Sequence, residues 1–138
     1  MQGRDEEFDL YCHGKPMIAR ELLAPVRKLI LAAVPEVSEG RVHFYLVYYF
    51  GGGSVAKLHL DARQQVNTTL VTGEDLPDPS RLLKGASTNR TIKITSDAFF
   101  EKNRAAIADL VRQSFTLISE RFDRSGTFVT LRADQTSP

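Results

Sequence analysis

Two histidines and an aspartate in the middle of the sequence have the clearest capacity for chemistry. His59 and Asp61 are separated by one residue, so both would point from the same face of a β-strand. His43 would lie opposite Asp61 in the strand register that the hydrophobic pattern favours. Two imidazoles and one carboxylate form a ligand set suited to ferrous iron. The alternative is that all three are ordinary polar residues on a solvated surface.

A larger set of polar and aromatic residues falls on the same face of the predicted sheet. Tyr45, His59 and Asn67 would lie side by side on three neighbouring strands, with opposed Cβ atoms about 4.5–5.5 Å apart. Since Tyr and Arg are enriched at interfaces, this outward face predicts the binding of a small ligand or a protein partner, or burial in a homodimer. An ordinary solvated sheet face is the alternative. The candidate binding residues are Arg41, His43, Tyr45, Lys57, His59 and Asn67.

The strands that carry these residues are predicted from alternating hydrophobicity. Three strands are expected, over residues 41–50, 54–60 and 66–70. Their even-numbered positions carry the apolar side chains, and a slip of one residue would turn that whole set into water. Even-numbered residues must therefore oppose each other, which pairs Phe50 with Ser54 across three glycines and Leu60 with Val66 across a loop.

Helices are predicted on either side of these strands in the sequence. The first begins at Pro16 and is bent or divided at Pro25, because proline removes a hydrogen bond from a helix interior. Its apolar stripe consists of Ile18, Leu22, Val26, Leu29 and Ala33. A long helix over 97–122 begins at the N-cap Ser96 and has a stripe of Phe100, Ile107, Val111, Ile118 and Phe122, widened by Leu110 and Phe115.

The remaining segments complete a single domain. A short capped helical turn is expected over 78–85, and strands over 90–95 and, at the sheet edge, 127–131. Residues 1–15 are expected to form a loose arm, residues 16–131 the domain, and residues 132–138 a frayed tail. This order predicts a two-layer α+β sandwich, in which helices cover one face of a mainly antiparallel sheet.

A family resemblance rests on residues 51–94, which resemble the YdhG-like (DUF1801) proteins. The matching positions include Val55-Ala56-Lys57-Leu58, Val66-Asn67, Gly73, Leu76, Asp78-Pro79, Leu82-Leu83, Gly85, Arg90 and Ile92-Lys93-Ile94. The resemblance implies an α-β(3)-α-β(2)-α fold similar to that of secretion chaperones, in a small cytosolic protein without an assigned activity. Some members are described as frataxin-like iron chaperones, so an iron carrier is the alternative function.

This chain departs from the family at three places. It has no proline between Pro35 and Pro77, it has Ala86 after Gly85 in place of a Gly-Thr-Gly-Lys segment, and it has Thr68 where relatives are hydrophobic. A function tied to the Gly-Lys loop is therefore not expected. The motif of Leu76, Asp78, Pro79, Leu82, Leu83 and Gly85 is interpreted as architectural, with the two leucines in the core.

Composition excludes several other classes of function. With 138 residues, 18 Lys+Arg and 17 Asp+Glu, the chain is one nearly neutral domain, which argues against a general nucleic-acid binder. Its single cysteine, Cys12, cannot form an internal disulfide. No stretch resembles a signal peptide or a membrane span, so a cytoplasmic location is expected. Since no nucleophile motif is present, we expect a non-enzymatic binding module without a cofactor; an enzyme with a site that sequence cannot reveal is the remaining alternative.

Overall fold

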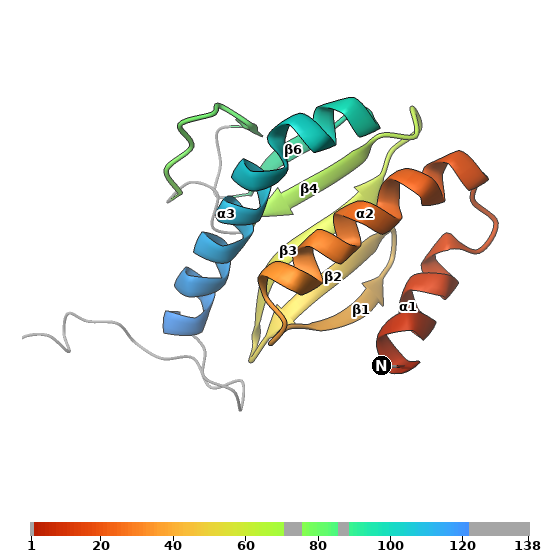
Figure 1. The fold of residues 1–138 in the computed structure, drawn as a ribbon. Helices are drawn as coiled ribbons and strands as arrows, with labels where there is room; N and C mark the ends of the chain where they lie inside the picture. The colour runs from red at the N-terminus through yellow and green to blue at the C-terminus, as the bar shows by residue number, and fades with distance from the viewer. Residues whose placement is uncertain (1, 71–75, 86–88, 122–138) are drawn as a thin grey trace, which may run out of the picture.

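A six-stranded antiparallel sheet forms one layer of the protein (Figure 1). The computed structural model describes residues 2–70, 76–85 and 89–121, with side chains from Glu6 onward. The strands are β1 (Ser38–Val42), β2 (Tyr45–Phe50), β3 (Gly53–Leu60), β4 (Val66–Leu70), β5 (Leu83–Lys84) and β6 (Arg90–Ile94). Their order in the sheet is β1-β2-β3-β4-β6-β5, and each neighbouring pair is antiparallel.

Helices form the second layer. They are α1 (Gln2–Cys12), α2 (Met17–Ala33) and α3 (Asp97–Arg121). Figure 1 shows α2 and α3 crossing the same face of the sheet, with α1 beside β1. This arrangement confirms the predicted two-layer α+β class. None of the helices in the described part of the chain combines the length and the apolar character that crossing a membrane requires.

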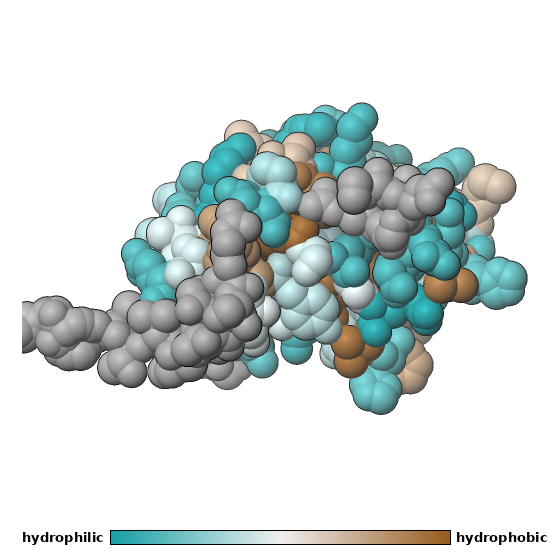
Figure 2. All heavy atoms as spheres, turned by 90° about the horizontal axis from the view of Figure 1, so that it is seen from below, coloured by the Kyte–Doolittle hydropathy of each residue, from teal (hydrophilic) through white to brown (hydrophobic). Residues whose placement is uncertain are grey.

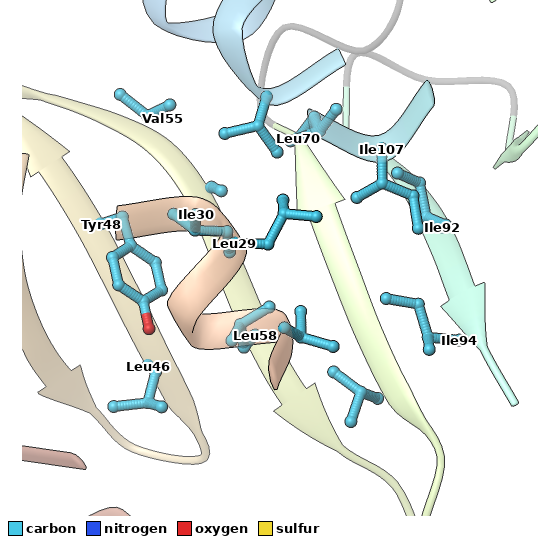
Figure 3. Packing of buried hydrophobic residues seen from close by; sticks show 14 of the residues in the cluster. Leu29, Ile30, Leu46, Tyr48, Val55, Leu58, Leu70, Ile92, Ile94 and Ile107 are labelled. Atoms are coloured by element: carbon cyan, nitrogen blue, oxygen red, sulfur yellow. The ribbon is translucent and has the colours of Figure 1, made fainter. Parts of the chain in front are cut away.

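The core lies between the sheet and the helices α2 and α3, as predicted from the parity of the strands. Leu46 opposes Leu58 and Thr68 opposes Ile92, and all four side chains are buried. Figure 3 shows strand residues such as Tyr48 and Leu58 together with Ile30 of α2 in this core cluster. The predicted pairing of Leu60 with Val66 is confirmed. Lys57 and His59 of β3 and the odd-numbered residues of β4 and β6 therefore face away from the helices, whereas Val55 of β3 is buried in the core.

The first strand departs from the prediction. Residues 41–50 form two strands instead of one, because the chain reverses at His43 and Phe44 between Val42 and Tyr45. His43 has φ +56°, a conformation rare for residues other than glycine. The alternating pattern of apolar residues continues through the turn, so it conceals the reversal. The sheet therefore gains β1 as a separate edge strand beside β2.

The glycine turn is one residue tighter than predicted. Phe50 opposes Gly53 instead of Ser54, and the register shifts between Tyr48 and Tyr49 through a bulge. The bulge supplies the extra residue that the parity of the strands requires, so the inner register remains as predicted. Gly51 adopts φ +59° in this turn, which glycine accepts without strain.

The N-terminal segment is a helix, which contradicts the expected loose arm of residues 1–15. Phe8, Tyr11 and Cys12 are buried, and their spacing of three and four residues places them on one face of α1. This apolar face spans little more than one turn. It is too short to stand out as a periodic pattern in the sequence, yet it suffices to dock the helix.

The two long helices differ from their predictions in detail. α2 continues through Pro25, and Ile18, which was assigned to its buried stripe, is exposed. α3 begins as predicted, with the amide of Phe99 donating to the Ser96 hydroxyl over 3.1 Å. Its predicted stripe is buried at Phe100, Ile107, Val111 and Ile118, and also at Leu110, whereas Phe115 is partly exposed.

The segment over 78–85 is a turn followed by β5, not a helical turn. Asp78 nevertheless caps it, since its carboxylate accepts the amides of Leu82 and Leu83 over 2.9 and 2.8 Å. Both leucines are buried, as predicted, and Gly85 has φ +105°. Phe122, the predicted strand over 127–131 and the tail over 132–138 lie outside the described residues.

Candidate functional site

A cavity of about 210 Å³ lies at the end of the sheet where β1 turns into β2 and β3 ends. The C-terminal end of α1 and the connection to α2 form its other side. Its titratable lining residues, apart from Tyr11, are His13, Lys15, Arg41, His43 and His59. Leu10, Tyr11, Phe44 and Leu60 complete the lining. The site thus combines an N-terminal helix with the end of a sheet from the middle of the chain.

Tyr11 fixes the helix α1 against this end of the sheet. Its hydroxyl donates to the carbonyl of Phe44 over 2.6 Å and accepts the amide of Leu60 over 3.2 Å. Continuing the β2–β3 register would place Phe44 opposite Leu60, so the hydroxyl is inserted where the two strands separate. Burial raises the pKa of Tyr11, which keeps the hydroxyl protonated and able to donate.

Arg41 lies on the opposite side of the sheet from the one predicted. It opposes Leu46, whose side chain is in the core, and therefore faces the helix layer. The reversal at His43 causes this change, because β1 has its own register to β2. The guanidinium Nε of Arg41 lies 3.1 Å from the carboxylate of Glu7 in α1. This ion pair is partly exposed and adds a second link between α1 and the sheet.

A buried charged cluster anchors β1 beneath α2. The carboxylate of Glu39, which is fully buried, accepts two hydrogen bonds from Arg27 over 2.9 and 3.0 Å. The Tyr48 hydroxyl donates to the same carboxylate over 2.6 Å. Burial and the neighbouring charge of Glu39 raise the pKa of Tyr48 well above its ordinary value, so it remains a donor. The cluster holds the strand that carries Arg41 and leads to His43.

The lining of the cavity is cationic. It contains a lysine, an arginine and three imidazoles, and no aspartate or glutamate. The Nζ of Lys15 lies 4.3 Å from the ring centre of Tyr11, which directs the ammonium group along the cavity wall. Such a lining favours an anion.

The predicted iron ligands are not brought together. No group of three or more His, Cys, Asp or Glu within the described ranges is placed to share a metal ion. The carboxylate of Asp61 accepts the amides of Arg63 and Gln65 over 2.9 and 3.0 Å, and the side-chain amide of Asn67 over 3.2 Å. Although partial burial acts in the other direction, these hydrogen bonds lower the pKa of Asp61. Asp61 therefore serves the β3–β4 turn.

The outward face of the sheet retains the predicted alignment of three strands. His59 opposes Asn67, and the ring centres of Tyr45 and His59 lie 5.4 Å apart. The Nζ of Lys57 lies 5.6 Å from the ring centre of Tyr45. Tyr45, Lys57, His59 and Asn67 are therefore neighbours, as predicted, whereas Arg41 and His43 join His59 only at the cavity.

Exposed hydrophobic residues border the cavity. Leu10, Val42 and Phe44 are each more than 40% exposed, and Tyr45 is 37% exposed. A second pair, Met17 and Ile18, lies at the start of α2. In the view of Figure 2, hydrophobic residues appear at separate places on a mainly hydrophilic surface. The rim of the cavity thus offers apolar contacts beside its cations.

Two of the cavity residues could not be assigned from the sequence. His13 and Lys15 lie in the segment predicted to be a loose arm, so nothing indicated that they would meet His43 and His59. The spacing of Phe8 and Tyr11, which dock α1, was the feature of the sequence that could have indicated a packed helix here. Cys12 next to His13 is buried, and burial raises the pKa of its thiol, which disfavours the reactive thiolate.

Comparison with protein-family models, curated proteins and solved structures yields no match to this chain.

Proposed function

We propose that this protein binds a small anionic molecule in the cavity at the end of its sheet. One observation carries the proposal: a lysine, an arginine and three imidazoles from three separate segments line one cavity, in which the arginine, Arg41, is paired with Glu7. Arginine and lysine make charge-assisted hydrogen bonds to carboxylate and phosphate oxygens. The imidazole N–H groups add further donors.

The dimensions of the cavity limit the ligand. A volume of about 210 Å³ can hold a phosphate or sulfate group with a small organic part. Because no three of the described ligand-type residues converge on one point, the cavity suits a polyatomic anion better than a metal ion. The exposed ring of Phe44 on the rim would contact an apolar portion of such a molecule.

The test is a titration with sulfate and with inorganic phosphate, followed by isothermal calorimetry. Lys15→Gln should weaken binding about tenfold, which corresponds to 1.4 kcal/mol. Lys102→Gln, which removes an exposed lysine from α3, is the matched control and should leave the affinity unchanged. Unsaturable heats, or equal losses in both variants, would refute the proposal.

The broader interpretation remains that of a binding module. Membership of the YdhG-like proteins, a cytoplasmic location and the absence of catalysis stay predictions from the sequence. An iron carrier also stays a prediction, and it would require ligands other than the combination of His43, His59 and Asp61. Anaerobic titration with ferrous iron tests it, and saturable uptake that His59→Ala abolishes would support it.

A further inference from the structure

Two rows of polar side chains cross the outward face of the sheet. One row passes from Lys57 on β3 through Thr69 and Thr91 to Lys84 on β5. The hydroxyls of Thr69 and Thr91 are 3.0 Å apart and share a hydrogen bond. Since neighbouring strands are about 4.8 Å apart, the Cα atoms of the two lysines are separated by roughly 14 Å.

The second row is aromatic at one end and cationic at the other. It passes from Tyr45 on β2 through His59 and Asn67 to Lys93 on β6. Tyr49, on the same strand as Tyr45, lies over β1, where its ring would be 3.2 Å from a Cβ placed on Gly40. Glycine at position 40 therefore allows this second ring to lie across the sheet.

The described outward strand positions of the sheet carry lysines but no acidic residue. Among the acidic residues of the described ranges, only Glu39 lies in a strand, and it is buried against Arg27 beneath the helices. Lys57, Lys84 and Lys93 thus face outward without an acidic residue at any outward strand position. The carboxylate of Asp61 accepts hydrogen bonds from its own turn and from Asn67, and it interacts electrostatically with Lys93 at the end of this face. The net charge of +1 therefore does not reveal the three lysines at outward strand positions of the sheet.

We propose that the outward face binds single-stranded nucleic acid. The three lysines would contact phosphates, while Tyr45 and Tyr49 would stack against bases that are free of a complementary strand. Asn67 and the threonine hydroxyls supply sequence-tolerant polar contacts between them. This assignment rests on the strand rows and does not require the cavity at the end of the sheet.

Charge and ring chemistry together select this partner over two others. An acidic polypeptide would satisfy the lysines, but its acidic side chains have no aromatic ring to stack on the exposed tyrosine. Duplex DNA would also satisfy the lysines, but its bases are stacked inside the helix and cannot reach the rings. A single strand matches both features, because its backbone is charged and every base presents a π face.

The test is fluorescence anisotropy with a fluorescein-labelled twelve-nucleotide oligo(dT) in 50–200 mM salt. The double variant Lys57→Gln/Lys93→Gln should weaken binding at least tenfold. If each lysine contacts one phosphate, the slope of log affinity against log salt should fall in magnitude by about 1.4. The matched control, Lys28→Gln/Lys102→Gln, removes two exposed lysines from α2 and α3 and should retain the affinity of the parent protein.

The stacking contact needs a separate variant. Tyr45→Leu keeps an apolar side chain and should weaken oligo(dT) binding about fivefold to tenfold, whereas Tyr45→Phe should bind normally. Circular dichroism establishes that each variant is folded. The proposal is overturned if oligo(dT) does not bind at 50 mM salt, if both lysine pairs cause equal losses, or if Tyr45→Leu has no effect. It is also overturned if polyglutamate or a blunt duplex binds as tightly as the single strand.

Discussion

The buried cluster of Arg27, Glu39 and Tyr48 offers a quantitative test of how β1 is held in place. Replacing Arg27 with Met leaves the Glu39 carboxylate buried without its guanidinium partner. Breaking a buried ion pair in this way costs about 3–5 kcal/mol, because the remaining charge loses its compensation. Arg27→Met should therefore lower the free energy of unfolding by about that amount, measured by urea denaturation followed by circular dichroism.

A double-mutant cycle separates the charge from the packing. Glu39→Gln keeps the shape of the side chain and lets Tyr48 donate to an amide oxygen, so its cost should be about 1–3 kcal/mol. In the Glu39→Gln background, Arg27→Met no longer leaves a buried carboxylate without its ion-pair partner. The two changes together should therefore cost less than their sum by about 2 kcal/mol, which is typical of groups in direct contact.

Arg20 provides the matched control for this cycle. Like Arg27, it lies over the ring of Phe8, at 5.4 Å, but its ion pair with Asp9 is on the surface, with side chains 48% and 61% exposed. Arg20→Met should therefore cost no more than about 1 kcal/mol. Costs for Arg27→Met and Glu39→Gln that add within about 0.5 kcal/mol, or a cost for Arg20→Met as large as that for Arg27→Met, would refute the role assigned to the buried charge.

Four further substitutions test separate parts of the structure. Thr68→Val should stabilise the protein by about 1 kcal/mol in urea unfolding, because the buried Thr68 hydroxyl has no hydrogen-bond partner among the described residues; a loss of stability would contradict this assignment. Leu83→Ala should cost about 2–5 kcal/mol, and a loss below about 1 kcal/mol would contradict its place in the core. Tyr11→Phe should cost about 1–3 kcal/mol and accelerate hydrogen exchange at the amide of Leu60, which loses its acceptor; unchanged exchange would show that α1 is docked by other contacts. Asp61→Asn should lower the free energy of unfolding at pH 7. Since the pKa of Asp61 is lowered on folding, the difference in this free energy from the parent should shrink as the pH falls below about 4. A difference that is constant with pH would contradict the hydrogen bonds assigned to the carboxylate.

The sheet interior was predictable because parity constrains it strongly. Apolar residues at alternating positions exclude every slip by an odd number of residues, and with a short loop between the strands this predicted the pairing of His59 with Asn67. The reversal at His43 and Phe44 was not predictable in the same way. It lacks the glycine or asparagine that usually marks a two-residue turn, and Phe44 continues the apolar alternation across it. Arg41 was consequently assigned to the wrong face.

The cavity residues that come from α1 and the segment after it could not be predicted from hydrophobic periodicity. The docking of α1 depends on three buried residues in one turn and on a single hydroxyl, that of Tyr11, inserted between two strands. Tertiary contacts of this kind leave no repeating pattern in the sequence. His13 and Lys15 could therefore be read as individual residues, while their convergence with His59 emerged only from the fold.

Histidine-selective NMR tests the central claim most directly, because the chain contains only three histidines and all three line the cavity. During titration with sulfate at constant pH and ionic strength, the imidazole signals of His13, His43 and His59 should shift along one common saturation curve. The same titration of Lys15→Gln should give a curve displaced to about tenfold higher sulfate. Imidazole signals that stay unmoved, or that drift independently without saturating, would contradict an anion site at the end of the sheet.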